Sequence, residues 1–168
     1  MKLNILEKNV KIKNMRKVSV IFIALLVSCT LKMDAIYPIH IYNESEVQYI
    51  GYYFATGGRY GSYYPDTLLP NNNTYVYNKN IKPKQHLQYD SWIKWDVTFK
   101  SLPKDTLSIF IFSSDTLNKY SWEEVRRDYK ILKRYDLSIQ DLELLDYKVY
   151  YPPIPAMSGM KMYPKYGR

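Results

Sequence analysis

Apolar and polar residues alternate along several short segments of the chain, which is the pattern of half-buried β-strands. In segment 91–99, Ile93, Trp95, Val97 and Phe99 fall on one side and polar positions fall between them, which predicts a strand. The same reasoning predicts strands in 37–45, 47–55, 71–79, 130–137 and 147–153.

Segment 105–114 is apolar on both sides. Leu107, Ile109 and Ile111 alternate with Phe110 and Phe112, so neither face of a strand here would be polar. This pattern predicts a central strand that is covered on both faces, with the next element along the chain covering the second face.

Two helices are predicted late in the chain, over 119–130 and, more weakly, over 136–147. Ser121 with Glu124 and Ser138 with Asp141 have the spacing of capping boxes, in which a serine and an acidic residue satisfy the first backbone N–H groups of a helix. Each helix therefore has a sequence signal for its start.

These elements predict a mainly β fold, an immunoglobulin-like β-sandwich with one or two short helices near the C-terminal end. The alternative is an α+β fold with a single sheet. The domain is expected to span residues 37–153, where prolines end the last strand. Residues 154–168 show no periodicity and are expected to form a mobile tail.

The N-terminal segment has a different composition. A basic stretch at 11–17 precedes an apolar run at 18–27, which is too short to span a bilayer and has the length of a signal-peptide core. The run ends in the tetrapeptide Leu26-Val27-Ser28-Cys29, which contains the one cysteine of the chain.

This ending resembles the lipobox of bacterial lipoproteins, with an aliphatic residue at −3, a small residue at −1 and then cysteine. The resemblance implies that residues 1–28 are a signal peptide, that Cys29 carries lipid and that 29–36 form a tether. Several acyl chains would hold such a protein on a membrane durably. Translation from either Met1 or Met15 fits this leader. Thr30 favours the outer membrane, and the leaflet stays open.

The net charge of +8 overstates how basic the mature chain would be. Residues 1–28 carry six Lys and Arg residues and one Glu, so removing them leaves a charge of about +3. So small an excess does not indicate a nucleic-acid partner. One cysteine also excludes a disulfide within the chain.

Residue patterns that carry chemistry are weak. His40 and His86, the two histidines, lack a metal-ligand spacing, and the glycine-rich segment 57–61 lacks the Lys-Ser/Thr of a phosphate-binding loop. We therefore expect no catalytic residues, metal or cofactor, and a protein that is not an enzyme.

Aromatic residues are the best functional lead, since 19 of the 168 residues are tyrosines. Trp92, at an outward strand position, together with Tyr60, Tyr63 and Tyr64 is a candidate platform for stacking sugar rings. Exposed aromatic groups of this kind mark interaction sites.

Residues 105–152 and the leader together resemble small uncharacterised lipoproteins of Bacteroides-type bacteria with an all-β domain. This resemblance implies location and architecture and assigns no functional residue. The expected function is a non-enzymatic binding or structural module of the cell envelope, anchored by lipid, with an envelope protein or polysaccharide as partner. The alternative is a glycan-binding accessory lipoprotein.

Overall fold

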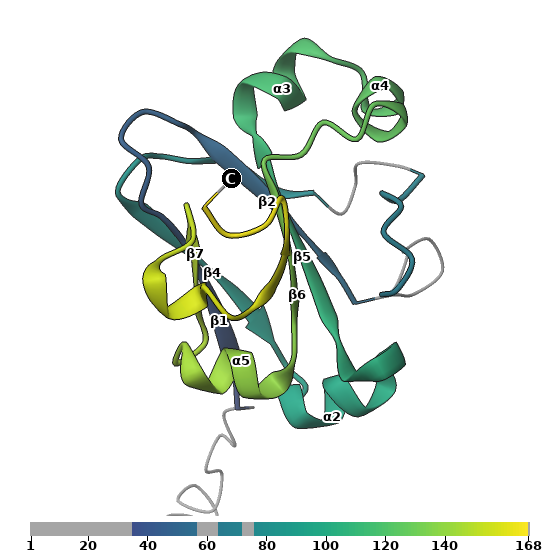
Figure 1. Cartoon of the computed structure of the whole chain (residues 1–168), viewed down its shortest axis with the longest axis vertical. Coiled ribbons are helices and arrows are strands. Elements are labelled where there is room, and N and C mark those ends of the chain that lie inside the picture. Colours follow the sequence, from purple (N-terminus) through teal and green to yellow (C-terminus); the bar gives the residue numbers. More distant parts are fainter. Residues whose placement is uncertain (1–34, 57–63, 72–75, 168) are drawn as a thin grey trace, which may run out of the picture. The chain divides into compact units, whose positions relative to one another are not determined.

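The structure, a computed structural model, describes residues 35–56, 64–71 and 76–167, with only the backbone at 77–79 (Figure 1). The predicted signal peptide, Cys29 and most of the tether lie outside these residues. The described residues belong to one unit, 35–168, that combines helices with two β-sheets.

Sheet A has three strands in the order β4-β1-β7. Its central strand β1 (Tyr37–Asn43) runs antiparallel to β4 (Gln85–Ser91) and parallel to β7 (Lys148–Tyr151). In β1 the alternation predicted from sequence is present, because Ile39 and Ile41 are buried whereas His40 and Tyr42 are half-buried on the other face.

Sheet B has five antiparallel strands in the order β3-β2-β5-β6-β8. They are β2 (Ile50–Ala55), β3 (Tyr77–Ile81), β5 (Leu107–Ser113), β6 (Lys133–Leu137) and β8 (Lys161–Tyr163). The second sheet makes the single-sheet alternative wrong. The immunoglobulin-like arrangement stays a prediction.

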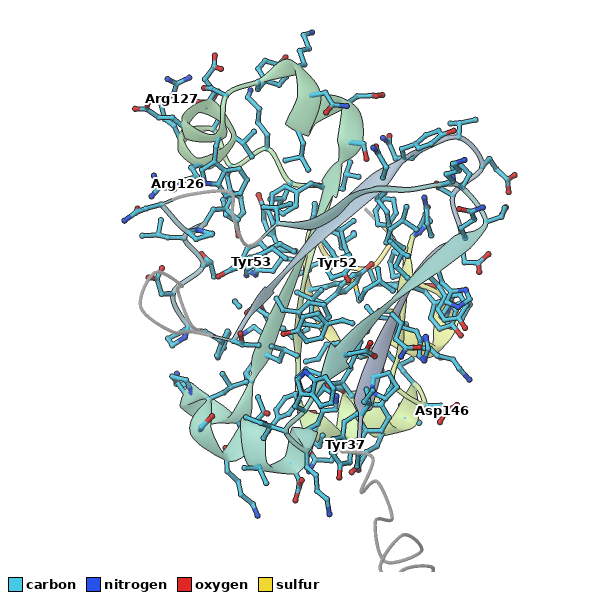
Figure 2. The ribbon with its side chains drawn as sticks, turned by 180° about the vertical axis from the view of Figure 1, so that it is seen from behind. Tyr37, Tyr52, Tyr53, Arg126, Arg127 and Asp146 are labelled. Atoms are coloured by element: carbon cyan, nitrogen blue, oxygen red, sulfur yellow. The ribbon has the colours of Figure 1, made fainter. Side chains whose placement is uncertain are left out.

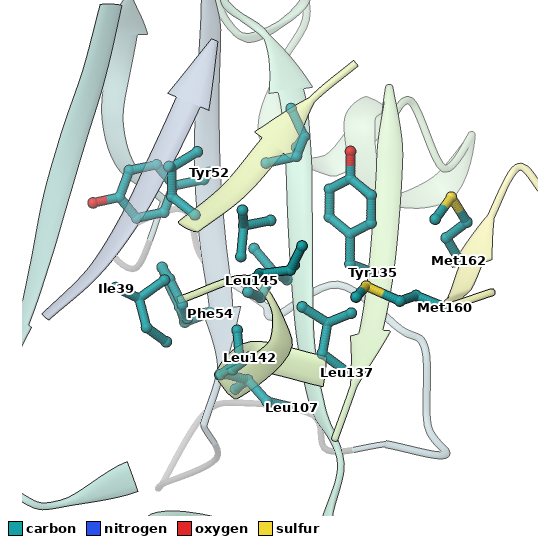
Figure 3. Close-up of a cluster of buried hydrophobic side chains, with 14 of the residues drawn as sticks. Ile39, Tyr52, Phe54, Leu107, Tyr135, Leu137, Leu142, Leu145, Met160 and Met162 are labelled. Atoms are coloured by element: carbon teal, nitrogen blue, oxygen red, sulfur yellow. The ribbon is translucent and has the colours of Figure 1, made fainter. Parts of the chain in front are cut away.

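The main core contains buried side chains from both sheets (Figure 3). Ile39 and Ile41 of sheet A belong to the same cluster as Ile109 and Tyr135 of sheet B. Two polar contacts also join the sheets. The Tyr135 hydroxyl donates to the carbonyl oxygen of Tyr150 at 2.7 Å, and the buried amide of Asn43 donates to the carbonyl oxygen of Ile81 at 2.9 Å.

Strand β5 is buried on both faces, as the sequence predicts. Leu107, Ile109 and Ile111 belong to the main core, whereas Phe110 and Phe112 belong to a second cluster. Two short helices that follow β5 contribute to the second cluster, α3 (Ser114–Lys119) and α4 (Trp122–Arg127). The prediction that the next element covers the second face is confirmed.

Both predicted capping boxes are confirmed, at the start of α4 and of α5 (Ile139–Leu144). The helices are shorter than predicted, and α3 was not predicted. Tyr129 after α4 and Asp146 after α5 have positive φ angles, so the chain leaves the helical conformation soon after each helix ends.

The predicted strand 91–99 is wrong. Sheet A takes its edge strand from residues 85–91, and residues 95–101 form helix α2 (Trp95–Ser101), followed by the short helix η1 (Pro103–Asp105). Trp95 and Phe99 are buried, whereas Ile93 and Val97 are 58% and 52% exposed. Residues four apart share a face in both a helix and a strand, so Trp95 and Phe99 fit either interpretation.

The predicted mobile tail is also wrong. Residues 155–163 form the short helix η2 (Pro155–Met157) and strand β8, which pairs with β6. Met157, Met160 and Met162 are buried in the main core. Strand β8 has only three residues, and the unbranched methionine side chain fits irregular gaps, so no clear periodicity marks this segment in the sequence.

Candidate binding surfaces

Three aromatic rings form a row across the face of sheet A that is turned away from the core. Tyr42 on β1 is in register with His86 on β4 and with Tyr150 on β7. The Tyr42 ring centroid is 4.5 Å from that of His86 and 5.0 Å from that of Tyr150, and both pairs are stacked. We call His86, Tyr42 and Tyr150 the aromatic row.

His40 lies beside this row, in register with Gln88 and Lys148. Its ring centroid is 5.7 Å from that of His86, so the two histidines of the chain lie on one face. The Nδ1 atom of His40 is buried and has no hydrogen-bond partner among the residues that the structure describes. A buried polar atom without a partner is uncommon in a native protein.

Charges of both signs flank His40 and the aromatic row. Lys148 Nζ lies 2.6 Å from Asp146 Oδ2, and this ion pair lowers the pKa of Asp146 and raises that of Lys148. On the other side, Gln88 donates a hydrogen bond to Asp90. The Tyr42 ring has a neighbouring ring on each side, so this surface offers ring edges, hydroxyl groups and charges rather than a flat open platform.

A depression of about 520 Å³ lies where β1 begins, between α2 and α5. Its walls combine apolar and charged side chains: Ile36, Tyr37, Pro38, Lys94, Trp95, Asp96, Glu143 and Tyr147. Burial raises the pKa of Tyr147, and the carboxylates of Glu143 and Asp96 raise it further. These carboxylates therefore act electrostatically on Tyr147.

Of the predicted sugar-stacking residues, the structure describes Trp92 and Tyr64. Trp92 is 69% exposed in the bend between β4 and α2. The Tyr64 ring faces Lys161 Nζ at 4.4 Å from its centroid, and Lys161 also donates a hydrogen bond to the Tyr64 hydroxyl. Tyr60 and Tyr63 lie outside the described residues. Among the described residues of this candidate platform, Trp92 is the one that is exposed to solvent.

Basic side chains around α4 and β6 have structural partners. Arg126 donates to the carbonyl oxygen of Leu69 and to the side chain of Asn71, and Arg134 pairs with Asp136. Figure 2 shows Arg126 and Arg127 at the opposite end of the unit from Tyr37 and Asp146. The ion pairs of this region use the carboxylates of Asp128 and Asp136.

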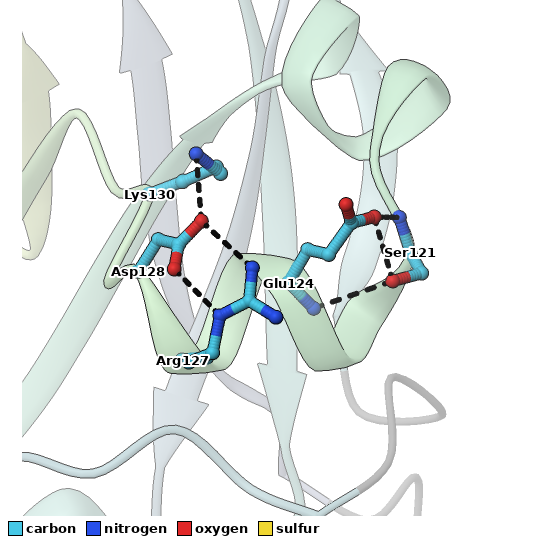
Figure 4. A network of polar contacts seen from close by, with 5 residues as sticks. All are labelled: Ser121, Glu124, Arg127, Asp128 and Lys130. Atoms are coloured by element: carbon cyan, nitrogen blue, oxygen red, sulfur yellow. Dashed lines mark hydrogen bonds and ion pairs between the residues drawn. The ribbon is translucent and has the colours of Figure 1, made fainter.

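Asp128 accepts from two cations at the end of α4 (Figure 4). Arg127 Nε lies 2.8 Å and Lys130 Nζ 3.0 Å from its carboxylate oxygens. These hydrogen bonds lower the pKa of Asp128 to about 2. The cluster is exposed and stabilises the turn after the helix, which explains its charges without a ligand.

The aromatic row is the feature that sequence reasoning missed. Alternation in 37–43 already places His40 and Tyr42 on one face, so the contribution of β1 to this surface could be predicted. The contributions of His86 and Tyr150 depend on which strands flank β1. Strand β7 follows β1 by more than a hundred residues and lies parallel to it, and no local pattern specifies that pairing.

Within the described ranges, no group of acidic, histidine and cysteine side chains could hold a metal ion. No helix in those ranges is long and apolar enough to cross a bilayer. Comparisons of the chain with known protein families, with curated proteins and with solved structures give no match.

Proposed function

We propose that the protein is a lipoprotein of the bacterial cell envelope, anchored on the outer membrane through Cys29. One observation carries the proposal: the only cysteine follows a ten-residue apolar run and stands directly after Leu26-Val27-Ser28. A basic segment before the run completes the arrangement of a lipoprotein leader. We also propose that the protein is one of the small lipoproteins of Bacteroides-type bacteria that residues 105–152 and the leader resemble.

Membrane fractionation of producing cells tests the anchor. The wild-type chain should sediment with membranes and dissolve in detergent, whereas Cys29→Ser should appear in the soluble fraction because no thiol accepts the lipid. Ser28→Ala is the matched control, since it keeps a small residue at −1 and should stay on membranes. Retention of Cys29→Ser on membranes would contradict the anchor.

We further propose that the domain binds an envelope protein rather than catalysing a reaction, through the outer face of sheet A. The stacked aromatic row, the unpartnered Nδ1 of His40 and the flanking charges support this assignment. Tyrosine, which supplies two of the three rings, is enriched among the residues that dominate protein binding.

In-cell photo-crosslinking tests the binding face. A crosslinking amino acid at position 86, at the end of the aromatic row, should give a discrete conjugate with another envelope protein. The same group at Val47, which is 83% exposed at the turn after β1, is the control and should not give it. Identical conjugates from both positions would argue against a specific face.

Glycan binding is the second candidate, and the 69% exposure of Trp92 favours it. On this reading the indole ring stacks on a sugar face at the membrane surface. Affinity electrophoresis in polysaccharide gels should then show retention that Trp92→Ala loses and Val47→Ala keeps. Equal migration of the wild type in gels with and without polysaccharide would count against it.

A further inference from the structure

Large apolar side chains gather at the end of the unit where β1 begins. Ile36 is 44%, Trp92 69% and Ile93 58% exposed, and Val97 on α2 and Leu144 on α5 are 52% and 72% exposed. We call these five residues the apolar end. Apolar groups that gather in this way on a soluble surface mark a contact with a partner or a membrane.

Several contacts place these residues at one end. Tyr37 at the start of β1 pairs with Ser91 at the end of β4. Ile36 precedes Tyr37 and Trp92 follows Ser91, so both residues adjoin this pair. The depression at this end is lined by Ile36, by Asp96 next to Val97, and by Glu143 next to Leu144. Figure 1 shows α2 and α5 together at the end of sheet A where β1 begins.

This end is also the one joined to the proposed anchor. Cys29 and Ala35 are six residues apart, and an extended chain spans at most about 3.5 Å per residue, so the lipid and Ala35 are separated by no more than about 20 Å. If Cys29 carries lipid, the short tether keeps the apolar end close to the bilayer.

We propose that the apolar end rests on the lipid surface, with Trp92 at the level of the headgroups. This inference depends on the proposed anchor at Cys29. Tryptophan favours the boundary between headgroups and acyl chains, since its large ring is apolar and its N–H is polar. An apolar contact next to the anchor orients the domain and turns other faces of sheets A and B toward the periplasm or the medium.

Charge at this end indicates what kind of lipid surface fits. Lys94, Lys100 and Lys104 are exposed near α2, and Asp96, Asp105 and Glu143 are exposed beside them. Since the two signs are balanced, attraction to anionic lipid is small and the apolar side chains supply the contact. Vesicles of zwitterionic phospholipid are therefore sufficient, and salt has little effect.

The three tryptophans provide a direct readout. Trp92 is open to solvent, whereas Trp95 is 4% exposed inside the core. Trp122 belongs to α4, at the other end of β5 from α2, and its Nε1 donates to the carbonyl oxygen of Pro70. Bromine atoms on lipid acyl chains quench only indole rings that lie close to them, so they report on Trp92.

The experiment uses the lipidated full chain in phosphatidylcholine vesicles with and without brominated acyl chains. Wild-type emission should be quenched in the brominated vesicles, and emission of Trp92→Phe should not. The double variant Val97→Ser/Leu144→Ser should lose roughly half of the quenching, because it removes part of the inserted apolar area. Val47→Ser, at the opposite end of β1, should be quenched like the wild type.

Flotation of the same vesicles separates the two proposals. Protein that floats with the vesicles but shows no bromine quenching keeps the anchor and overturns the surface contact. Protein that does not float overturns both, because the anchor is what brings this end to the bilayer. Unquenched Trp92, combined with loss of polysaccharide retention in Trp92→Ala, would assign the ring to a glycan and overturn the lipid contact.

Discussion

The hydroxyl of Tyr135 on sheet B donates a 2.7 Å hydrogen bond to the carbonyl oxygen of Tyr150 on sheet A. Tyr135 is fully buried in the main core, and burial raises the pKa of its hydroxyl, so the group stays a donor at ordinary pH. The bond joins the two sheets directly behind the aromatic row, because Tyr150 is the end residue of that row.

Tyr135→Phe tests this link between the sheets. The variant keeps the ring in the core and removes the donor to Tyr150, so we expect the free energy of unfolding to fall by about 1–3 kcal/mol. Urea denaturation measures the change. Tyr163→Phe is the matched control, because Tyr163 is 52% exposed, and it should lie within about 0.5 kcal/mol of the wild type.

Met157→Ala tests the integration of the C-terminal segment into the core. Met157 is fully buried, so removing most of its side chain should lower the free energy of unfolding by about 2–5 kcal/mol. Lys165→Ala, at an exposed position of the same segment, should change it by less than about 0.5 kcal/mol. Equal stability of both variants would indicate that the segment does not pack as described.

The capping box at Ser138 should contribute measurably to the stability of the fold. Its hydroxyl accepts from the N–H of Asp141 at 3.2 Å, and Asp141 accepts in return from the N–H of Ser138. Ser138→Ala should cost about 0.5–2 kcal/mol in thermal or urea unfolding. Ser138→Asp supplies another capping acceptor and should recover most of that loss; no recovery would mean that the cap is not the cause.

Asp128 predicts an acid dependence of stability. Its pKa of about 2 in the folded protein lies below the ordinary value of 3.8, so the folded state binds the proton more weakly than the unfolded chain. The contribution of the carboxylate is therefore present above about pH 4 and is lost as the pH falls toward 2. NMR titration should find this pKa, and Arg127→Gln should raise it; an unchanged value would contradict the ion pair.

The sequence predicts much of the fold where the signal is local. Alternation correctly identifies β1 and β2, and a run that is apolar on both faces identifies β5. The spacing of Ser121 with Glu124 and of Ser138 with Asp141 identifies two helix starts. Segment 91–99 fails because its buried residues, Trp95 and Phe99, share a face in a helix as well as in a strand.

The candidate binding face was less predictable for a different reason. Tyr42, His86 and Tyr150 come from three distant segments, and a parallel pairing between β1 and β7 brings two of them together. Such pairing follows from the packing of the whole chain rather than from any short pattern. The exposed Trp92 was found from the sequence, although as a strand residue rather than as part of a bend before α2.

Mass spectrometry of the N-terminal peptide of the mature protein tests the lipid anchor at Cys29. We expect this peptide to begin at Cys29 and to carry a diacylglycerol on the thiol, with Thr30 as its next residue. The Ser28→Ala control should give the same lipidated peptide, because it keeps a small residue before Cys29. A mature peptide that retains residues before Cys29, or that begins there with an unmodified thiol, would show that Cys29 is not a lipid anchor.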